Sequence, residues 1–210
     1  LTNRVAIDRP ITVQSVNGPD VTRIEGATDP SGWYGKGPAA VRCAYVGNQA
    51  QLSGFTLSNG ATKFTYDNDG GGGGCRCEAS GVLTNCTVRN NTAEYAGGGV
   101  WRGTLNNCLV VSNQVGMSGG GVANSTLNRC TVAYNQGYYG GASWAATLNN
   151  CLVRGNTGGG EGGMVVWYGT LNNCTVVDNS GGGGVVESTL NNCIVVGNSP
   201  NYSNSTFNYS

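Results

Sequence analysis

Residues 104–110 read Thr-Leu-Asn-Asn-Cys-Leu-Val, and closely related heptads recur along the chain from residue 82 onward. The other copies begin at Val82, Thr126, Thr147, Thr170 and Thr189. Each copy carries one cysteine at the same place, and these cysteines are Cys86, Cys108, Cys130, Cys151, Cys174 and Cys193. An asparagine follows each cysteine by five positions, which gives Asn91, Asn113, Asn135, Asn156, Asn179 and Asn198. Successive cysteines are 22, 22, 21, 23 and 19 residues apart, so the chain contains an internal repeat.

The repeat unit is typical of short strands separated by tight bends. β-Branched pairs such as Val176-Val177 stand beside Asn and Gly, which tolerate the left-handed backbone of corners. One such coil is too small to enclose a core, but coils stacked at the ~4.8 Å strand spacing place like residues on like and bury continuous columns. We expect two apolar columns to point inward with the cysteines: Leu83, Leu105, Leu127, Leu148, Leu171 and Leu190, and Val88, Val110, Val132, Val153, Val176 and Val195. The asparagine column is expected to join its side-chain amides from coil to coil.

The remaining segments fit one solenoid domain over residues 1–210. Residues 1–60 read as divergent coils with strands at Ile11–Val16, Val21–Ile24, Val41–Val46 and Gly54–Asn59, and Phe55 takes the place of the cysteine. Residues 61–80 read as a loop insertion, residues 81–198 as the regular coils and residues 199–210 as an irregular tail.

Composition narrows the functional classes. The 210 residues include 37 glycines, and 11 acidic residues balance 11 basic ones. A neutral chain without a basic run offers no footprint for nucleic acid, and no apolar run approaches the ~18 residues that a membrane span needs. The chain opens at Leu1 without a leader, which indicates a mature product or a fragment, and its scarcity of lysine beside abundant Gly, Asn, Ser and Thr favours an extracellular or cell-surface protein.

Two short patterns carry a resemblance to known proteins. Gly98-Gly-Val100 followed by Val110-Val-Ser-Asn113 is similar to the repeats of bacterial polymorphic outer-membrane proteins. More broadly, residues 81–198 resemble right-handed parallel β-helix proteins of the pectate-lyase-like superfamily, with residues 11–60 a looser match. The resemblance implies an all-β, single-stranded right-handed parallel β-helix with coils of about 22 residues. It does not select one function, because this superfamily includes lyases, glycosidases, tailspikes and adhesins.

Residues for hydrolase or lyase chemistry do not gather in the repeat. Glu94, Glu161, Asp178 and Glu187 fall at different phases of the coil, and the chain has no histidine. Asp67 and Asp69 form a weak calcium candidate without the rest of a known ligand set, and an ordinary flexible turn is the simpler interpretation. We therefore predict no catalytic residues and no cofactor.

Aromatic residues suggest carbohydrate binding as an alternative. Trp101, Trp144 and Trp167 each precede a column cysteine by seven residues, with Tyr168 adjacent and Tyr138-Tyr139 nearby. These rings form a candidate platform for sugars. The competing interpretation is that they pack on a bend or in the core, because Ala123 and Val186 fill the same column in other coils.

A threonine column raises ice binding as a further alternative. Its members are Thr104, Thr126, Thr147, Thr170 and Thr189. The second rank that we considered contains Thr87, Leu109, Thr131, Leu152, Thr175 and Ile194, and this alternation does not favour an ice-matching face.

The nine cysteines fall into two groups. Column cysteines are expected to be reduced, because parallel in-register side chains point the same way rather than at one another. Cys75 and Cys77 in the predicted loop are candidates for a disulfide with Cys43 or, less favourably, a zinc site.

Seven glycosylation sequons arise from the Asn-rich, Thr-rich composition. They lie at Asn85, Asn90, Asn124, Asn173, Asn201, Asn204 and Asn208. Asn85 and Asn173 adjoin the inward cysteines, and we expect them to be poorly exposed.

Together these features predict a non-enzymatic extracellular structural or adhesive module: a surface spacer, adhesin segment or filament subunit. Expected partners are a second copy placed end to end, or further coils of a longer chain, and glycans. The alternative is a carbohydrate-binding or polysaccharide-degrading β-helix protein.

Overall fold

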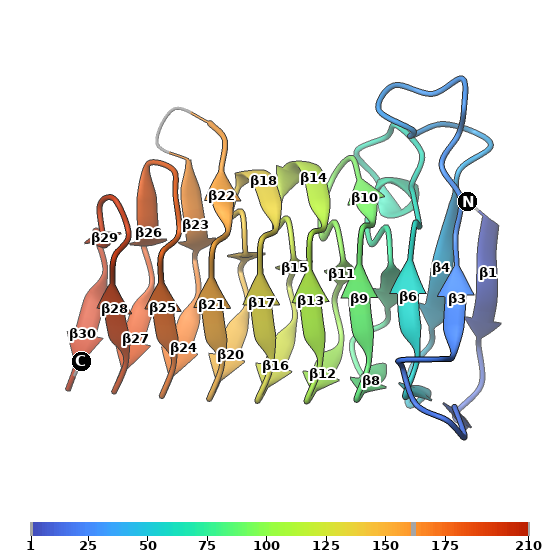
Figure 1. The fold of residues 1–210 in the computed structure, drawn as a ribbon, viewed down its shortest axis with the longest axis horizontal. Coiled ribbons are helices and arrows are strands. Elements are labelled where there is room, and N and C mark those ends of the chain that lie inside the picture. Colours follow the sequence, from blue (N-terminus) through green and yellow to red (C-terminus); the bar gives the residue numbers. More distant parts are fainter. Residues whose placement is uncertain (1, 161–162, 210) are drawn as a thin grey trace.

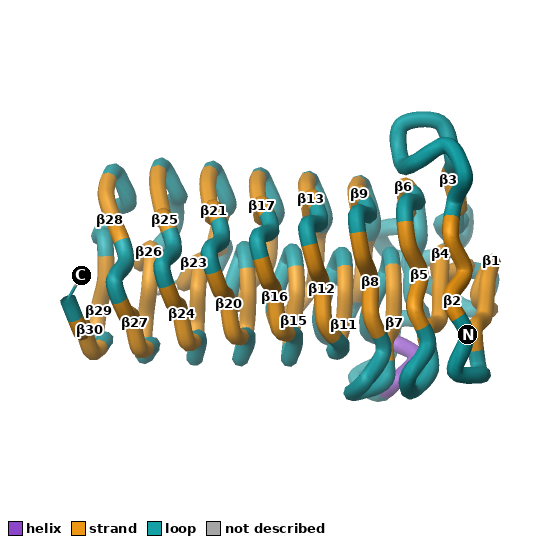
Figure 2. Tube along the Cα trace, turned by 90° about the horizontal axis from the view of Figure 1, so that it is seen from below, coloured by secondary structure: helices purple, strands orange, loops and turns teal. Residues whose placement is uncertain are grey.

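The computed structural model describes residues 2–160 and 163–209, and these form a parallel β-helix whose coils stack along one axis (Figure 1). Each regular coil contributes one short strand to each of three long sheets, which Figure 2 shows from a second side. All strand pairs within the sheets are parallel. The predicted fold class is therefore confirmed.

Sheets A and B each contain nine strands. Sheet A consists of β1 (Thr2–Ile7), β4 (Val41–Val46), β7 (Cys75–Cys77), β11 (Val100–Trp101), β15 (Val122–Ala123), β19 (Ser143–Trp144), β23 (Met164–Trp167), β26 (Gly183–Val186) and β29 (Tyr202–Ser203). Sheet B consists of β2 (Thr12–Gln14), β5 (Gln51–Ser53), β8 (Val82–Thr84), β12 (Thr104–Asn106), β16 (Thr126–Asn128), β20 (Thr147–Asn149), β24 (Thr170–Asn172), β27 (Thr189–Asn191) and β30 (Thr206–Asn208).

Sheet C contains eight strands, and a fourth, short sheet contains four. Sheet C consists of β3 (Arg23–Glu25), β6 (Thr56–Ser58), β9 (Thr87–Arg89), β13 (Leu109–Val111), β17 (Thr131–Ala133), β21 (Leu152–Arg154), β25 (Thr175–Val177) and β28 (Ile194–Val196). The short sheet consists of β10 (Thr92–Ala93), β14 (Gln114–Ser118), β18 (Gln136–Tyr139) and β22 (Thr157–Gly158), and the 3-10 helix η1 spans Asn68–Gly70.

The core consists of the predicted columns. Leu105 pairs with Leu127 and Leu127 with Leu148, so each leucine lies on its counterpart in the next coil. The leucine column is fully buried, as are the valines from Val88 to Val176, while Val195 is partly buried. Stacking like on like fills the narrow interior continuously, since every coil presents the same cross-section.

Left-handed residues make the bends between strands. Asn107 has a φ of 53° and Asn150 a φ of 54° at the corner between sheets B and C, where most coils place the second asparagine of the heptad. Asparagine adopts this conformation at lower cost than most residues. The expected bend chemistry is therefore confirmed.

The asparagines that follow the cysteines form an inner ladder. Asn113 donates through Nδ2 to Oδ1 of Asn135 at 3.0 Å and to the carbonyl of Val88 at 2.9 Å, and its backbone N–H donates to the same Oδ1 at 2.9 Å. The side-chain contact repeats from Asn91 to Asn198. The ladder predicted from sequence is confirmed, and it satisfies polar groups that have no access to water.

An outer ladder on sheet B was not predicted. Its members are the third residues of the Thr-Leu-Asn strands, and their amides join Asn106, Asn128, Asn149, Asn172, Asn191 and Asn208. The predicted threonine column lies beside it on the same sheet, so the rank next to the threonines is asparagine rather than the alternating rank, which lies on sheet C.

Glycine runs mark the side of each coil where backbones touch. Gly97 has a φ of 63°, and a Cβ on Gly98 would lie 2.4 Å from the carbonyl oxygens of both Gln114 and Gly120. A side chain has no room there, so the short sheet packs directly on the glycine run. This contact accounts for the high glycine content.

Two segment predictions need correction. Cys75–Cys77 is not part of a loop but forms β7, which pairs with both β4 and β11. The glycines around it obscured the strand in the sequence. Residues 202–208, predicted as an irregular tail, add β29 and β30, because Thr206-Phe-Asn208 keeps the heptad pattern with Phe207 paired to Leu190.

Candidate functional site

The predicted aromatic platform divides into buried and exposed parts. Trp144 and Trp167 are register partners on adjacent strands of sheet A, and both are half-buried. Trp101 is only 4% exposed, and its ring packs with Ala96 and Ala123. Trp101 therefore offers no open face to a ligand, and Trp144 packs against the edge of the same cluster.

Exposed and half-buried aromatic rings instead gather beside β18 and β23. Trp167 and Tyr168 stack with ring centroids 4.6 Å apart, and Tyr139 lies 5.1 Å from Trp167. Tyr138 contacts Tyr139 edge to face at 4.6 Å. A shallow groove of about 500 Å³ is lined by Tyr66, Tyr95, Met117, Tyr138 and Tyr139. We call the set Tyr66, Tyr95, Tyr138, Tyr139, Trp167 and Tyr168 the aromatic band.

A second groove, which sequence reasoning missed, lies beside the short sheet. It has a volume of about 340 Å³ and is lined by Trp33, Tyr34, Lys36, Phe64, Thr92, Glu94, Gln114, Val115, Gly116, Gln136, Gly137, Tyr138 and Gly159. In Figure 1 the loop after β3 and the loop before β7 both project from the side of the molecule that carries β10. We call this site the Lys36–Glu94 groove.

An ion pair forms part of the wall of this groove. Lys36 Nζ donates to Glu94 Oε2, and the two side chains are 6% and 7% exposed. The ammonium group also lies 5.5 Å from the centroid of the Phe64 ring and 5.9 Å from that of Tyr34. Gly116 leaves room for the carboxylate, because a Cβ there would lie 2.7 Å from Glu94 Oε2.

Asp29 fixes the loop that brings Trp33 to Lys36 over the groove. Its carboxylate accepts from the backbone N–H of Ala39 at 2.9 Å and from the N–H and hydroxyl of Ser31 at 2.9 and 2.8 Å. These donors, with Ala39 first, lower the pKa of the Asp29 carboxyl group. The loop is thus held by a buried acid within its own span.

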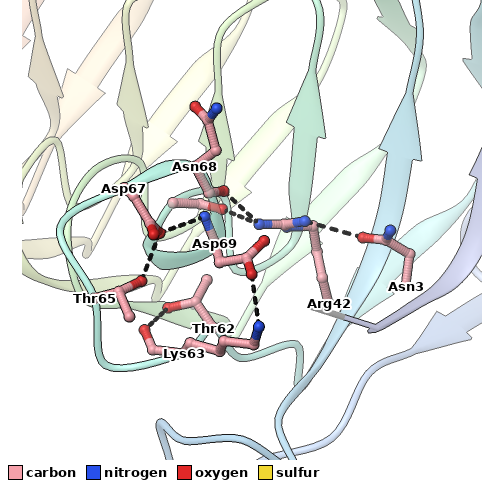
Figure 3. Close-up of polar contacts among 9 residues, drawn as sticks. Asn3, Arg42, Thr62, Lys63, Thr65, Asp67, Asn68 and Asp69 are labelled. Carbon is pink, nitrogen blue, oxygen red and sulfur yellow. Dashed lines mark hydrogen bonds and ion pairs between the residues drawn. The ribbon is translucent and has the colours of Figure 1, made fainter.

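The calcium candidates Asp67 and Asp69 have protein partners (Figure 3). Asp69 pairs with Lys63 at 2.7 Å, and this contact lowers the pKa of Asp69 to about 2. Asp67 Oδ1 accepts from the Thr65 hydroxyl at 2.7 Å and from the N–H of Asp69 at 2.9 Å. Within residues 2–160 and 163–209, no group of three or more His, Cys, Asp or Glu side chains is placed to hold a metal ion.

Arg42 anchors the turn that contains these acids. This buried side chain donates to the carbonyls of Gly72 at 2.8 Å, Gly71 at 2.6 Å and Asn68 at 3.2 Å, and to Asn3 Oδ1 at 3.0 Å. Burial lowers the pKa of Arg42 to about 10. Figure 3 shows the guanidinium reaching from β4 into the turn, so this segment is a held structure rather than the free turn expected.

All nine cysteines are buried in the structure. Column thiols donate to the backbone carbonyl two residues earlier, as Cys108 does to Asn106 at 3.3 Å. Cys43 contacts Ser58 and Asn91 rather than bonding to Cys75 or Cys77, and burial raises its pKa to about 12. Cys75 and Cys77 face the core with sulfurs 3.7 Å apart, because β7 is a strand and not a loop.

The two sequons predicted to be poorly exposed lie at the surface. Asn85 and Asn173 are exposed at left-handed corners, so the expectation that they are poorly exposed is wrong; the bend turns them away from the neighbouring cysteines. Glu161 lies outside the described residues. Glu187 accepts from Trp167 Nε1 at 3.1 Å, which ties it to the aromatic band.

Comparisons with protein-family models, curated proteins and solved structures found no match for this chain. Among the described residues, no helix is long and apolar enough to span a membrane.

Proposed function

We propose that this chain is a non-enzymatic structural or adhesive β-helix module that acts outside the cell or on its surface. The observation that carries the proposal is the unbroken inner ladder from Asn91 to Asn198, which links six consecutive coils through buried side-chain amides. The outer ladder on sheet B parallels it. A rod whose regular coils are tied by the inner ladder and again on sheet B suits a spacer that must hold its length.

Energetics support this role. A net contribution of about 1 kcal/mol per hydrogen bond is ordinary, and stacked repeats add such terms coil by coil. The sites that could bind a partner lie on loops and on the outer face, while the core columns stay the same from coil to coil. This separation of scaffold from surface is typical of proteins that present a binding face.

The test combines binding with chemistry. The purified chain is incubated with insoluble cellulose, chitin, xylan and pectin, and both protein retention and new reducing ends or unsaturated products are measured. Retention on at least one polysaccharide without product formation supports an adhesive module. Product formation that depends on the chain contradicts the non-enzymatic proposal.

Carbohydrate binding at the aromatic band is the second candidate function, and the stacked pair Trp167 and Tyr168 with Tyr139 favours it. The exposed ring of Tyr168 stacked on the half-buried Trp167 suits the apolar face of a sugar ring. Trp167→Ala/Tyr168→Ala should weaken retention on a polysaccharide, with Tyr134→Ala as a control for an exposed tyrosine outside the band. Equal retention by all three proteins would argue against the band.

The strands at the two ends of the three long sheets bear on end-to-end association. Val16, Val21 and Ile11 are exposed near the first coil, and Ile194 and Val196 are exposed on β28, the last strand of sheet C. We propose that these edges pair with a second copy or with further coils, since open sheet edges favour strand addition. Light scattering over a concentration series tests this, and a mass that stays monomeric at high concentration contradicts pairing between copies.

A further inference from the structure

The Lys36–Glu94 groove combines features that a structural rod does not need. Burying two opposite charges costs desolvation, and replacing such a pair with apolar residues is often neutral or stabilising. Here the pair lies at a groove whose volume of about 340 Å³ falls in the range of ligand sites. These two observations favour a ligand-binding role for the groove.

The ion pair has hydrogen-bonding capacity left over. A lysine ammonium carries three donors, and the hydrogen bond that Lys36 Nζ makes in the described part of the chain goes to Glu94 Oε2. The other carboxylate oxygen of Glu94, Oε1, accepts no hydrogen bond from the described residues. It is also absent from the buried unpaired atoms of the described chain. One charged donor and one charged acceptor side by side match a ligand that offers both hydroxyl oxygens and hydroxyl hydrogens.

Exposed aromatic rings surround the pair. Trp33 is 68% exposed and Tyr34 73% exposed, and they meet edge to face with centroids 5.4 Å apart. Phe64 and Tyr138 complete the aromatic rim. Large exposed rings gathered at one groove mark interaction sites more often than scattered ones do.

The short sheet supplies a regular polar wall. Gln114 pairs in register with Gln136, between Thr92 on one side and Thr157 on the other. Both glutamines are exposed, and their spacing follows the ~4.8 Å distance between strands. Amides repeated at this interval can contact successive units of an extended chain molecule.

We propose that the Lys36–Glu94 groove binds a short neutral oligosaccharide, with its rings on Trp33 and Tyr34 and its hydroxyl groups on Lys36, Glu94 and the two glutamines. The charges of the pair cancel, so the site favours a neutral glycan over an acidic one. This proposal goes beyond the structural role. The groove shares Tyr138 with the aromatic band, but the residues proposed to contact the glycan are not members of the band.

The experiment is calorimetric titration of the full chain with maltotriose, cellotriose, mannotriose, xylotriose and chitotriose, and with trigalacturonate as the acidic probe. We expect at least one neutral trisaccharide to bind. Trp33→Ala/Tyr34→Ala should weaken that binding roughly tenfold or more, the loss expected for a removed aromatic contact. Both residues are exposed, so the variant should keep the fold, which circular dichroism checks.

Two further variants separate this site from its neighbours. Lys36→Met/Glu94→Gln removes the charges without leaving either one unpaired and should also weaken binding, whereas Trp167→Ala/Tyr168→Ala should leave it unchanged. If Trp167→Ala/Tyr168→Ala loses glycan binding while Trp33→Ala/Tyr34→Ala and Lys36→Met/Glu94→Gln keep it, the glycan binds at the aromatic band and this proposal is overturned. Stronger binding of trigalacturonate, or no binding of any neutral probe, overturns it as well.

Discussion

The regular coils, residues 81–198, and the irregular N-terminal coils, residues 2–80, solve the same packing problem differently. In the regular coils every column repeats, so leucine lies on leucine and asparagine bonds to asparagine. In the N-terminal coils the apolar columns continue through Leu52 and Leu57, but the asparagine ladders do not extend into residues 2–80. Single residues make the polar contacts there: Arg42 holds a turn, Asp29 holds a loop, and Lys36 reaches Glu94 across 58 residues. Repetition builds the scaffold, and departures from it build the candidate binding groove.

The largest effect is expected in the middle of the leucine column. Leu127→Ala removes a fully buried side chain between Leu105 and Leu148 and should cost about 4 kcal/mol of unfolding free energy, because the stacked coils cannot collapse into the cavity. Val13→Ala in the first coil should cost about 1 kcal/mol, since Val13 is partly buried. Urea unfolding measures both, and equal losses would contradict the contrast between the regions.

The second-largest loss of unfolding free energy is expected in the inner ladder. Asn135→Ala removes the side-chain donor to the carbonyl of Val110 and the acceptor of both the backbone N–H and the amide of Asn113, whose amide keeps its bond to Val88. The buried N–H of Asn113 loses its acceptor, and we expect a cost of about 3 kcal/mol. Asn149→Ala on the half-exposed outer ladder should cost about 0.5 kcal/mol, because water replaces its contacts. A similar loss for both variants would mean that the inner ladder is not the stabilising one.

The Arg42→Met substitution tests whether a single buried side chain holds the turn in the N-terminal coils. Arg42→Met keeps much of the buried volume but removes the donors to the carbonyls of Gly71, Gly72 and Asn68, and should cost about 2 kcal/mol. Cleavage between residues 63 and 70 by a protease should become faster, whereas Arg89→Met on sheet C should leave it unchanged. Unchanged cleavage in the Arg42 variant would show that the turn is held by other contacts.

The smallest effect on stability is expected for the Lys63–Asp69 ion pair at low pH. The pKa of Asp69 is lowered from 3.8 to about 2 by Lys63, so its contribution to stability is present above pH ~4 and is lost as the pH falls through about 2. Among the described residues, no ion pair joins two residues of the regular coils, and Glu94 pairs with Lys36 from the N-terminal coils. Asp69→Asn should therefore reduce the extent to which acid loosens residues 63–70. Proteolysis of this segment at pH 2 to 5 measures the loosening. An acid response identical in the variant would rule out this pair as its source.

Sequence alone predicted the regular coils because each residue type recurs at the same phase, so that one heptad defines six coils. It missed β7 because Cys75-Arg-Cys77 has no heptad and follows a run of five glycines. The sequence left open whether the tryptophans are exposed or packed. It did not show that Trp101 is the buried one, because this depends on Arg76 and Ala123 in the neighbouring coils. The Lys36–Glu94 groove was not predictable for the same reason: it joins a loop outside the repeat to one acid inside it.

Hydrogen exchange tests the central claim most directly, namely that one continuous inner ladder makes residues 81–198 a rigid scaffold. The backbone N–H groups of Asn113, Asn135 and Asn156 donate to buried side-chain oxygens of the next coil, so they should exchange only through global unfolding. Amides in the loops at residues 29–36 and 63–67 should exchange far faster. Exchange of the ladder amides at the rate of these loops would contradict the account.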